Sequence, residues 1–392
     1  MQKTLFISTG EVSGDLHGGV LAKALFEEAK KKSIELTIYG VGGDKMRDAG
    51  VLLIADTTSI SAIGLWEAIP LILPTINIQR KINKILKQNS PDALILIDYM
   101  GPNINIGNAM RSSKSNIPII YYIAPQEWAW RVGSNSTTDL ISFTNKIFAI
   151  FKLEADFYSR RGGDVSWVGH PMLDMVETLP SRSVALKKLN LSSSEKIILV
   201  MPASRPQEIK YLMPKFMKGV KRLQLEDPNL IVFVLASRSI FESKILKSMN
   251  KFGVKGRVIP QKEVSHLRKY IYSLTTLALC KSGTVNMELA LNNIPQVVGY
   301  KVSRVTAFIA KRILNFKVNY ISPVNLILKS KLIPELVQKE FTVENIYSES
   351  TRILNNPDAR EEFKNGYNKL KLELGEPGVA KRAALEIIDY LS

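Results

Sequence analysis

Short apolar runs alternate with longer amphipathic stretches through the first part of the chain. The runs have the length of buried strands and are separated by helix-length segments, at positions 4–9, 36–42, 93–98, 117–124 and 146–151. Strands that alternate with helices are typical of βαβ units, whose strands form a parallel sheet. The pattern therefore predicts an α/β domain in this part of the chain.

A second series of strand-length runs follows after a pause. The segment 168–183 contains two prolines and a polar stretch, which mark a linker. Beyond it, apolar runs again alternate with helical segments, at 196–204, 230–237, 256–260, 277–283 and 295–301. These runs predict a second α/β domain with a parallel sheet of its own.

The chain is long enough for two hydrophobic cores. Its 392 residues exceed what one core normally serves, and the part from about 332 onward is charged and helical, so we expect no third sheet. We predict two doubly wound, Rossmann-like domains that face a cleft and a helical C-terminal segment. The expected divisions are an N-terminal domain at 1–180, a C-terminal domain at 181–345, and helices at 346–392 that pack on the N-terminal domain or on a partner subunit.

The composition is that of an ordinary globular protein. Hydrophobic residues make up 45% of the chain and charged residues 23%. The single cysteine, Cys280, excludes an internal disulfide and a cysteine-based zinc site, and its apolar neighbours predict a role in core packing. The first residues lack the apolar core of a signal peptide, and no apolar run approaches the length of a membrane span. We therefore expect a cytoplasmic protein, or one attached peripherally to a membrane.

The net charge of +17 favours anionic partners. Nucleic acid, anionic lipid and phosphorylated substrates all fit such a charge. The basic residues are scattered, however, and no array of aromatic and basic residues typical of an RNA-binding sheet is present, which argues against nucleic acid.

Polar residues and glycines are gathered where the first strand ends, in the run Ser8–Gly19. Its four glycines permit a tight loop that can press against a ligand. The carboxyl end of a first parallel strand usually faces the ligand crevice, so the polar residues of the loop are predicted to bind substrate: Glu11, Ser13, Asp15 and His17. The alternative is a helix start capped by Ser13 or Asp15.

Two further groups of candidates follow strands of the first domain. Asp98 ends an apolar strand and is followed by Asn103; a carboxylate at this place can act as general base, or it can cap the next helix. Trp128 and Arg131 follow the next strand, where tryptophan either packs in the core or forms a wall for a sugar or an acyl chain.

The second domain offers two strand ends suited to phosphate. After Lys281 the small residues Ser282, Gly283 and Thr284 lead into a helix whose free N–H groups can bind an anion. Glu288, one turn further, can accept hydrogen bonds from ribose, or it can stabilise the first helical turn. At the other strand end, Ser204 and Arg205 can donate hydrogen bonds to a diphosphate.

The segment 63–88 is unusually apolar at its start and basic afterwards. The apolar residues include Trp66, Ile69, Leu71, Ile72 and Leu73, and the basic ones are Arg80, Lys81, Lys84 and Lys87. An apolar face with a basic rim is typical of an element that lies on a membrane surface. The alternative is a helix buried between the sheet and a loop.

Seven motifs together carry a resemblance that spans almost the whole chain. They are "GEVSGDLHG", "VGG..M", "LIDYMGPN", "APQEWAWR", "VGHP..D", "P.SR..EI" and "SGT...E", in this order. In these motifs the chain resembles the lipid-A-disaccharide synthases, which have the GT-B fold of two-domain glycosyltransferases. The resemblance implies a reaction that joins UDP-2,3-diacylglucosamine to 2,3-diacylglucosamine 1-phosphate through a β-1,6 linkage, with inversion, release of UDP and no metal or other cofactor.

The resemblance also implies where each substrate binds. The "SGT...E" and "SR" motifs would hold UDP, Asn325 would belong to the substrate site, and Asp98 and Glu11 would lie on the acceptor side, with either as the base. Acylated substrates imply a place at the cytoplasmic face of an anionic inner membrane, and a homodimer is compatible with the pattern.

The chain departs from the family pattern at three places. Ala124 stands where serine is common, Ala203 replaces a glycine, and Pro323-Val324-Asn325 stands for Leu-Pro-Asn. These departures concern fine specificity. Two other functions remain open: another GT-B enzyme that acts on a UDP-N-acetylglucosamine substrate, and a non-catalytic, basic nucleotide-binding protein.

Overall fold

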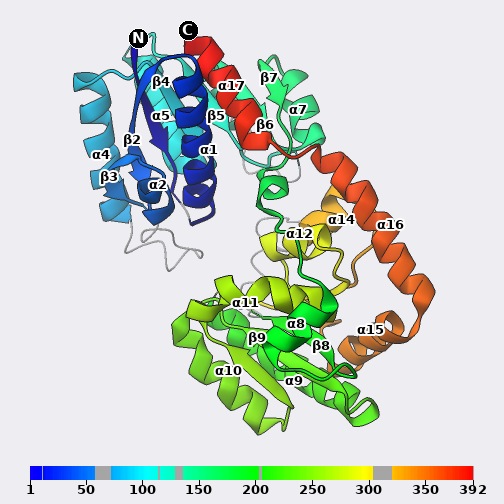
Figure 1. The fold of residues 1–392 in the computed structure, drawn as a ribbon. Coiled ribbons are helices and arrows are strands. Elements are labelled where there is room, and N and C mark those ends of the chain that lie inside the picture. Colours follow the sequence, from blue (N-terminus) through cyan, green and yellow to red (C-terminus); the bar gives the residue numbers. More distant parts are fainter. Residues whose placement is uncertain are drawn as a thin grey trace. The chain divides into compact units, whose positions relative to one another are not determined.

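The computed structural model describes residues 1–10, 12–57, 72–113, 115–128, 136–202, 205–302 and 320–391 (Figure 1). The chain divides into two compact units. Unit 1 contains Met1–Asp174 together with Leu374–Ser392, and unit 2 contains Met175–Glu373. The second unit is thus inserted in the sequence of the first.

Unit 1 is built on a seven-stranded parallel sheet with the order β3-β2-β1-β4-β5-β6-β7. Its strands are β1 (Gln2–Ser8), β2 (Glu35–Gly42), β3 (Leu52–Asp56), β4 (Ala93–Ile97), β5 (Ile119–Tyr122), β6 (Lys146–Ala149) and β7 (Val165–Trp167). The five runs predicted as strands in this half are confirmed as β1, β2, β4, β5 and β6. The edge strands β3 and β7 were not predicted, because their residues are mostly half-exposed and form no apolar run.

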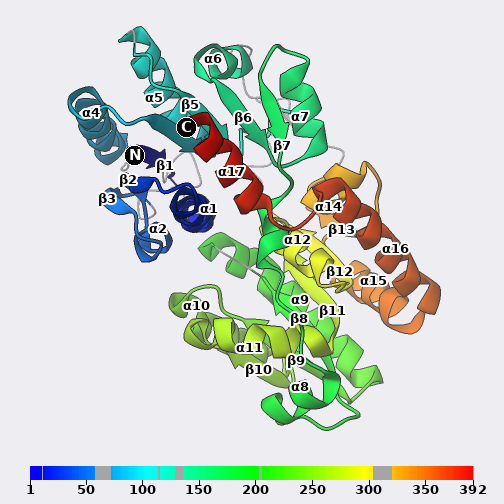
Figure 2. The same cartoon turned by 45° about the horizontal axis from the view of Figure 1, so that its top comes forward.

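Helices cover the sheet of unit 1 and bring the two ends of the chain together. They are α1 (Val12–Lys31), α2 (Asp44–Asp48), α4 (Ile72–Gln88), α5 (Met100–Ser112), α6 (Ser136–Phe143), α7 (Lys152–Ser159) and the C-terminal α17 (Val379–Leu391). Helix α17 packs along α1, as both Figures 1 and 2 show. The Asp174 carboxylate caps α17, because it accepts the N–H groups of Gly378, Val379 and Ala380 at 2.5, 3.2 and 3.0 Å.

Unit 2 has a six-stranded parallel sheet with the order β10-β9-β8-β11-β12-β13. Its strands are β8 (Lys196–Met201), β9 (Leu230–Leu235), β10 (Gly256–Ile259), β11 (Thr275–Lys281), β12 (Gln296–Tyr300) and β13 (Glu335–Val337). The five predicted runs are confirmed as β8 to β12. The three-residue β13 adds an edge strand within the stretch that the sequence marked as charged and helical.

The helices of unit 2 include most of the C-terminal region. They are α8 (Arg182–Leu189), α9 (Pro206–Glu226), α10 (Ser239–Lys251), α11 (Gln261–Leu274), α12 (Thr284–Leu291), α14 (Pro323–Leu328), α15 (Val343–Asn355) and α16 (Pro357–Leu374). Helices α15 and α16 therefore pack in unit 2, while α17 alone returns to unit 1. Cys280 is fully buried in the core of unit 2, as predicted, and burial raises the pKa of its thiol to about 12.

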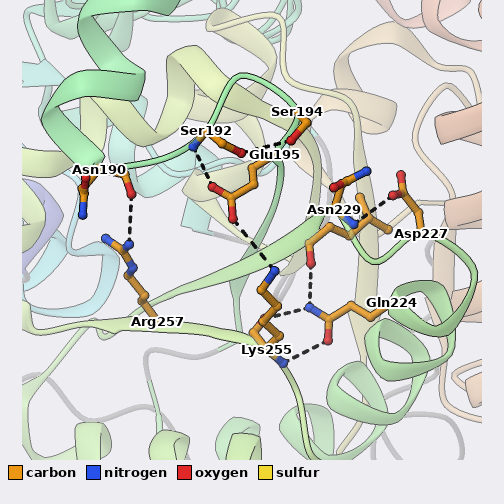
Figure 3. Close-up of polar contacts among 10 residues, drawn as sticks. Asn190, Ser192, Ser194, Glu195, Gln224, Asp227, Asn229, Lys255 and Arg257 are labelled. Atoms are coloured by element: carbon orange, nitrogen blue, oxygen red, sulfur yellow. Dashed lines mark hydrogen bonds and ion pairs between the residues drawn. The ribbon is translucent and has the colours of Figure 1, made fainter.

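Polar side chains link the loops at the amino ends of β8, β9 and β10 (Figure 3). Lys255 forms an ion pair with Glu195 at 3.9 Å, and its backbone N–H donates to the Gln224 side chain at 3.0 Å. Arg257 donates to the carbonyl of Asn190 at 3.4 Å. These groups bind one another, so the polar contacts at the amino ends of these strands stabilise the fold of unit 2.

Each sheet has a point where the strand order reverses. The reversal lies between β1 and β4 in unit 1 and between β8 and β11 in unit 2. In open parallel sheets, ligands bind outside the carboxyl ends of the strands at this switch point. The residues after β1, β4, β8 and β11 are therefore candidates for a functional site.

Candidate active site

The turn after β4 has an unusual backbone. Asp98 and Tyr99 have φ angles of 47° and 51°, and Ile123, at the end of the adjacent β5, has a φ of 61°. The Asp98 N–H donates to the Ile123 carbonyl at 3.1 Å, so these positions support one another. Positive φ is uncommon for residues other than glycine and costs free energy, and such residues cluster at functional sites. The turn thus fixes Asp98 at the switch point of unit 1.

Asn103 holds this turn in place. The side chain is fully buried, and its Nδ2 donates to the carbonyls of Asp98 and Ile97 at 2.8 and 3.1 Å. Its Oδ1 accepts the Ser8 hydroxyl at 2.7 Å, which ties the end of β1 to the end of β4. The sequence predicts Asn103 in the substrate site; in the structure, its hydrogen bonds position Asp98.

The loop predicted after β1 is much shorter than expected. Helix α1 begins at Val12, so Ser13 and His17 are helical, and the expectation of a loop that reaches Gly19 is wrong. The glycines serve close packing instead: a Cβ on Gly19 would lie 2.6 Å from the Lys45 carbonyl oxygen, and one on Gly10 would lie 2.1 Å from the Tyr99 ring. Glu11 lies outside the described residues.

Asp15 has a structural role. The side chain is 4% exposed, and its carboxylate accepts the backbone N–H groups of Gly43, Lys45 and Met46 at 2.8, 3.0 and 3.0 Å. It therefore caps α2 instead of the helix on which it lies. A carboxylate at a helix N-terminus satisfies N–H groups that have no intrahelical acceptor. These contacts give Asp15 a role in the architecture of unit 1, and its contact with substrate stays a prediction.

Replacing Asp15 with alanine is expected to lower the free energy of unfolding by about 1–3 kcal/mol, because buried N–H groups lose their acceptor. Urea denaturation measures the change. Asp44→Ala is the matched control, since this exposed carboxylate lies on the capped helix and pairs with Arg47 one turn away. Equal unfolding midpoints for Asp15→Ala and Asp44→Ala would contradict the cap.

Trp128 packs against an aromatic cluster in unit 1. Its ring lies 5.5 Å from Phe151, whose other neighbour is His170 at 4.9 Å between ring centroids. The indole N–H donates to the Gln126 side chain at 2.5 Å. The core-packing alternative therefore describes its contacts, and a wall toward the substrate is no longer needed to explain it. Arg131 lies outside the described residues.

Two histidines near this cluster are neutral. Burial lowers the pKa of His17 to about 4; burial, and after it repulsion between the two protonated imidazoles, lowers the pKa of His170 to about 3. The His17 Nδ1 is buried and has no hydrogen-bond partner in the described part of the chain. At neutral pH His17 can thus form a hydrogen bond with a ligand, but it carries no positive charge that would attract a phosphate.

In unit 2, the turn after β11 leads into α12 as predicted. Gly283 is the N-cap of α12 with a φ of 152°, a backbone conformation that residues with a side chain rarely adopt. The fully buried Asn286 accepts the Gly283 N–H at 2.8 Å and donates to the Lys281 carbonyl at 3.1 Å. Asn286 was missed, although its place three residues after the N-cap matches a capping box and could have revealed it.

The other strand end of the switch point carries Arg205. It is the N-cap of α9, and its backbone N–H donates to the Glu208 carboxylate at 3.0 Å. Glu208 in turn lies 3.5 Å from the Lys281 ammonium, so the ends of β8 and β11 are linked. The Arg205 Nε is buried and has no hydrogen-bond partner among the described residues. Ser204 and Ala203 lie outside them.

Glu288 and Ser282 flank this turn. The Glu288 carboxylate lies 2.9 Å from the Arg268 guanidinium of α11, a partner that the sequence did not indicate, and is 26% exposed. The Ser282 hydroxyl donates to the Ile321 carbonyl, and Thr284 is exposed at the first position of α12. Glu288 is thus held by a neighbouring helix and not by its own first turn.

The side-chain amide of Asn325 forms all its hydrogen bonds within unit 2. Its Nδ2 donates to the Ile333 carbonyl and to Glu335, each at 2.8 Å. Its Oδ1 accepts the N–H groups of Leu332 and Ile333 at 3.0 and 2.9 Å. These bonds exhaust two donors and two lone pairs. The Asn325 side chain therefore has a role in the architecture of unit 2, and its contact with substrate stays a prediction.

Two Rossmann-like units define a class of protein. Each has a parallel sheet with a switch point at the carboxyl ends of its central strands, which is the two-domain architecture of the GT-B fold. Residues 5–387 match the family model described as "Lipid-A-disaccharide synthetase". The lipid-A-disaccharide synthase of Prochlorococcus marinus is 50% identical over 385 residues, 98% of each chain. The chain belongs to the lipid-A-disaccharide synthase family and is a glycosyltransferase of lipid A biosynthesis.

Solved structures support the fold. A UDP-GlcNAc 2-epimerase from Neisseria meningitidis, bound to UDP-GlcNAc, matches with a TM-score of 0.62 at 15% identity and covers 99% of this chain and 100% of that one. MurG from Acinetobacter baumannii matches with a TM-score of 0.57 at 13% identity and covers 100% of both chains. At this identity the likeness concerns the fold alone, and it confirms the predicted GT-B type.

Proposed function

We propose that unit 2 binds the UDP part of UDP-2,3-diacylglucosamine and that unit 1 activates 2,3-diacylglucosamine 1-phosphate. In this proposal Arg205 and the N-terminus of α12, with Ser282, Gly283 and Thr284, hold the diphosphate, and Glu288 accepts the ribose hydroxyls. The product is a β-1,6-linked disaccharide 1-phosphate, and no metal takes part.

The proposed reaction is a direct displacement with inversion. The Asp98 carboxylate takes the proton of the acceptor 6-hydroxyl, the oxygen forms a bond to the anomeric carbon of the donor, and the bond to UDP breaks on the opposite face. Arg205 and the helix N–H groups stabilise the charge that develops on the leaving diphosphate. Glu11, on the same side by family resemblance, is the alternative base.

The observation that best supports this assignment is the turn after β4. Asp98 and Tyr99 have positive φ in this turn, and the buried Asn103 holds the Asp98 carbonyl at the carboxyl edge of the sheet. A side chain that served only to cap α5 would not require this conformation, since ordinary caps use extended backbone. The cost of the turn is more readily explained by a need to fix a reacting carboxylate.

The test is release of UDP by the purified protein. With UDP-2,3-diacylglucosamine and 2,3-diacylglucosamine 1-phosphate together, UDP and a disaccharide 1-phosphate are expected in equal amounts, and EDTA should not change the rate. Release from UDP-N-acetylglucosamine, with none from the acylated pair, would instead support the alternative GT-B function. Binding of nucleotide without turnover of either substrate would support the non-catalytic alternative.

The acylated substrates also suggest attachment to a membrane surface. None of the helices in the described ranges has the length and apolar character that a membrane crossing requires. Of the segment 63–88, residues 72–88 form α4, where Ile82 and Leu86 are each 1% exposed and pack in the core of unit 1. Trp66, Ile69 and Leu71 lie outside the described residues. The exposed Arg80, Lys84 and Lys87 leave a basic face on α4, suited to anionic lipid.

Replacing Arg80, Lys84 and Lys87 with serine is expected to weaken binding to anionic vesicles, because each basic residue near such a surface contributes about 1 kcal/mol. Co-sedimentation with phosphatidylglycerol vesicles, at low and at high salt, measures the loss. Lys81 is left unchanged, since its ammonium donates to the Ile54 carbonyl at 3.0 Å.

The matched control removes three charges from another exposed helix face. Lys244, Lys247 and Lys251 of α10 are all exposed, so their triple serine variant has the same net charge as the α4 variant. Binding should survive in this control. An equal loss in both variants would show that net charge alone acts, and would contradict a membrane face on α4.

A further inference from the structure

Lys281 lies where an anion would meet the switch point of unit 2. It is the last residue of β11, and its side chain is only 19% exposed. A Cβ placed on Gly283 would lie 3.6 Å from the Lys281 Nζ. The ammonium group is thus beside the N-cap of α12, where helix geometry leaves the first N–H groups without intrahelical acceptors. The ammonium and the positive end of the α12 dipole therefore lie at one place.

Lys281 lies near both a carboxylate and a second cation. Its Nζ lies 3.5 Å from Glu208 Oε1, while Glu208 Oε2 already accepts the backbone N–H of Arg205. Burial lowers the pKa of Lys281; Glu208 opposes this, and the nearby Arg205 guanidinium adds to it. Two cations, Lys281 and Arg205, therefore lie close enough to act on one another. A bound anion would be attracted by both.

Arg205 has a side-chain donor that no described residue satisfies. Its Nε is buried and finds no acceptor among the described residues, although a buried donor without a partner costs free energy. A purely structural ion pair between Lys281 and Glu208 would need neither this second cation nor the small-residue turn beside it. Phosphate oxygens, which accept several charge-assisted hydrogen bonds at once, fit both groups.

We propose that Lys281 contacts the diphosphate of the nucleotide donor as a second cation beside Arg205, and that Glu208 positions it over the start of α12. This inference rests on the proposed function, since it adds a ligand to the diphosphate site assigned there. The ligand class is a nucleoside diphosphate, and the contact is to its phosphate groups and not to its base or ribose.

The test compares three ligands on the full-length protein. Lys281→Met is expected to raise the dissociation constant of UDP about tenfold or more, as for a lost charge-assisted hydrogen bond. The dissociation constant of UMP should rise less, and that of uridine should not change. Lys281→Arg should bind UDP within about threefold of the parent, because the cation is retained. Isothermal titration calorimetry provides the constants.

Two further variants make the result decisive. Lys196→Met removes one charge at the opposite end of β8, where Lys196 pairs with Asp227 at 3.0 Å, and should leave UDP affinity unchanged. Arg205→Ala should weaken UDP binding. If Arg205→Ala weakens binding and Lys281→Met does not, the inference on Lys281 is wrong and the diphosphate site stands. If neither has an effect, the proposed site itself is wrong. A parallel loss of uridine affinity in Lys281→Met, with a lowered Tm, would assign Lys281 to structure alone.

Discussion

Replacing Asp98 with asparagine is expected to lower turnover by about two to four orders of magnitude, the range of general base catalysis. The amide keeps the shape of the side chain and loses the ability to accept a proton. The turn itself should persist, because Asn103 and Tyr121 hold the carbonyl of Asp98 at 2.8 Å each and do not depend on its carboxylate. Affinity for UDP should remain near that of the parent. Steady-state kinetics with both acylated substrates measure the loss.

Asp92→Asn is the matched control for this experiment. Asp92 lies just before β4, at the opposite end of the strand from Asp98, and its carboxylate binds the Lys3 ammonium at 3.1 Å and the Thr4 N–H at 2.7 Å. The variant should lose some stability and keep its turnover. If Asp98→Asn retains turnover, Asp98 is not the base, and the role passes to Glu11.

Replacing Arg205 with alanine is expected to weaken UDP binding by about 1–3 kcal/mol, or roughly five- to 150-fold, as for hydrogen bonds to a charged group. The substitution removes the guanidinium and spares the helix. The cap of α9 is made by the backbone N–H at this position and the Glu208 carboxylate, so any residue except proline can supply it. Calorimetric titration with UDP measures the change.

Arg238→Ala tests whether position matters or only charge. Arg238 is the N-cap of α10 and follows β9, so it has the same local setting as Arg205 but lies away from the switch point. UDP affinity should be unaffected in this variant. An equal loss for Arg238→Ala and Arg205→Ala would contradict a diphosphate site at the end of β8.

The central strands could be predicted because they are covered on both faces. All five residues of β4 are buried, and such strands form continuous apolar runs in the sequence. The edge strands β3, β7 and β13 contain mostly half-exposed residues and are only three to five residues long. Their residues form neither a continuous apolar run nor a regular alternation of apolar and polar positions, so the sequence contains no clear sign of these strands.

Residues at strand ends could be placed because topology fixes them. Asp98 and Arg205 follow strands that flank a switch point, and the order of strands and helices is enough to bring them there. The partners of Asp15 could not be foreseen, because they lie 28 to 31 residues away on a segment that only the folded unit brings close. The pairing of Glu288 with Arg268 could not be foreseen for the same reason, because Arg268 belongs to another helix. The neutral histidines depend on burial, which a single sequence does not reveal.

The insertion of unit 2 into unit 1 has a consequence for biosynthesis. The backbone N–H groups that bind the Asp174 carboxylate begin 204 residues later in the chain, at the start of α17. Unit 2 is complete once Glu373 has left the ribosome, whereas α1 still lacks the helix that packs along it. Unit 1 is therefore the first unit whose synthesis begins and the last whose synthesis is completed.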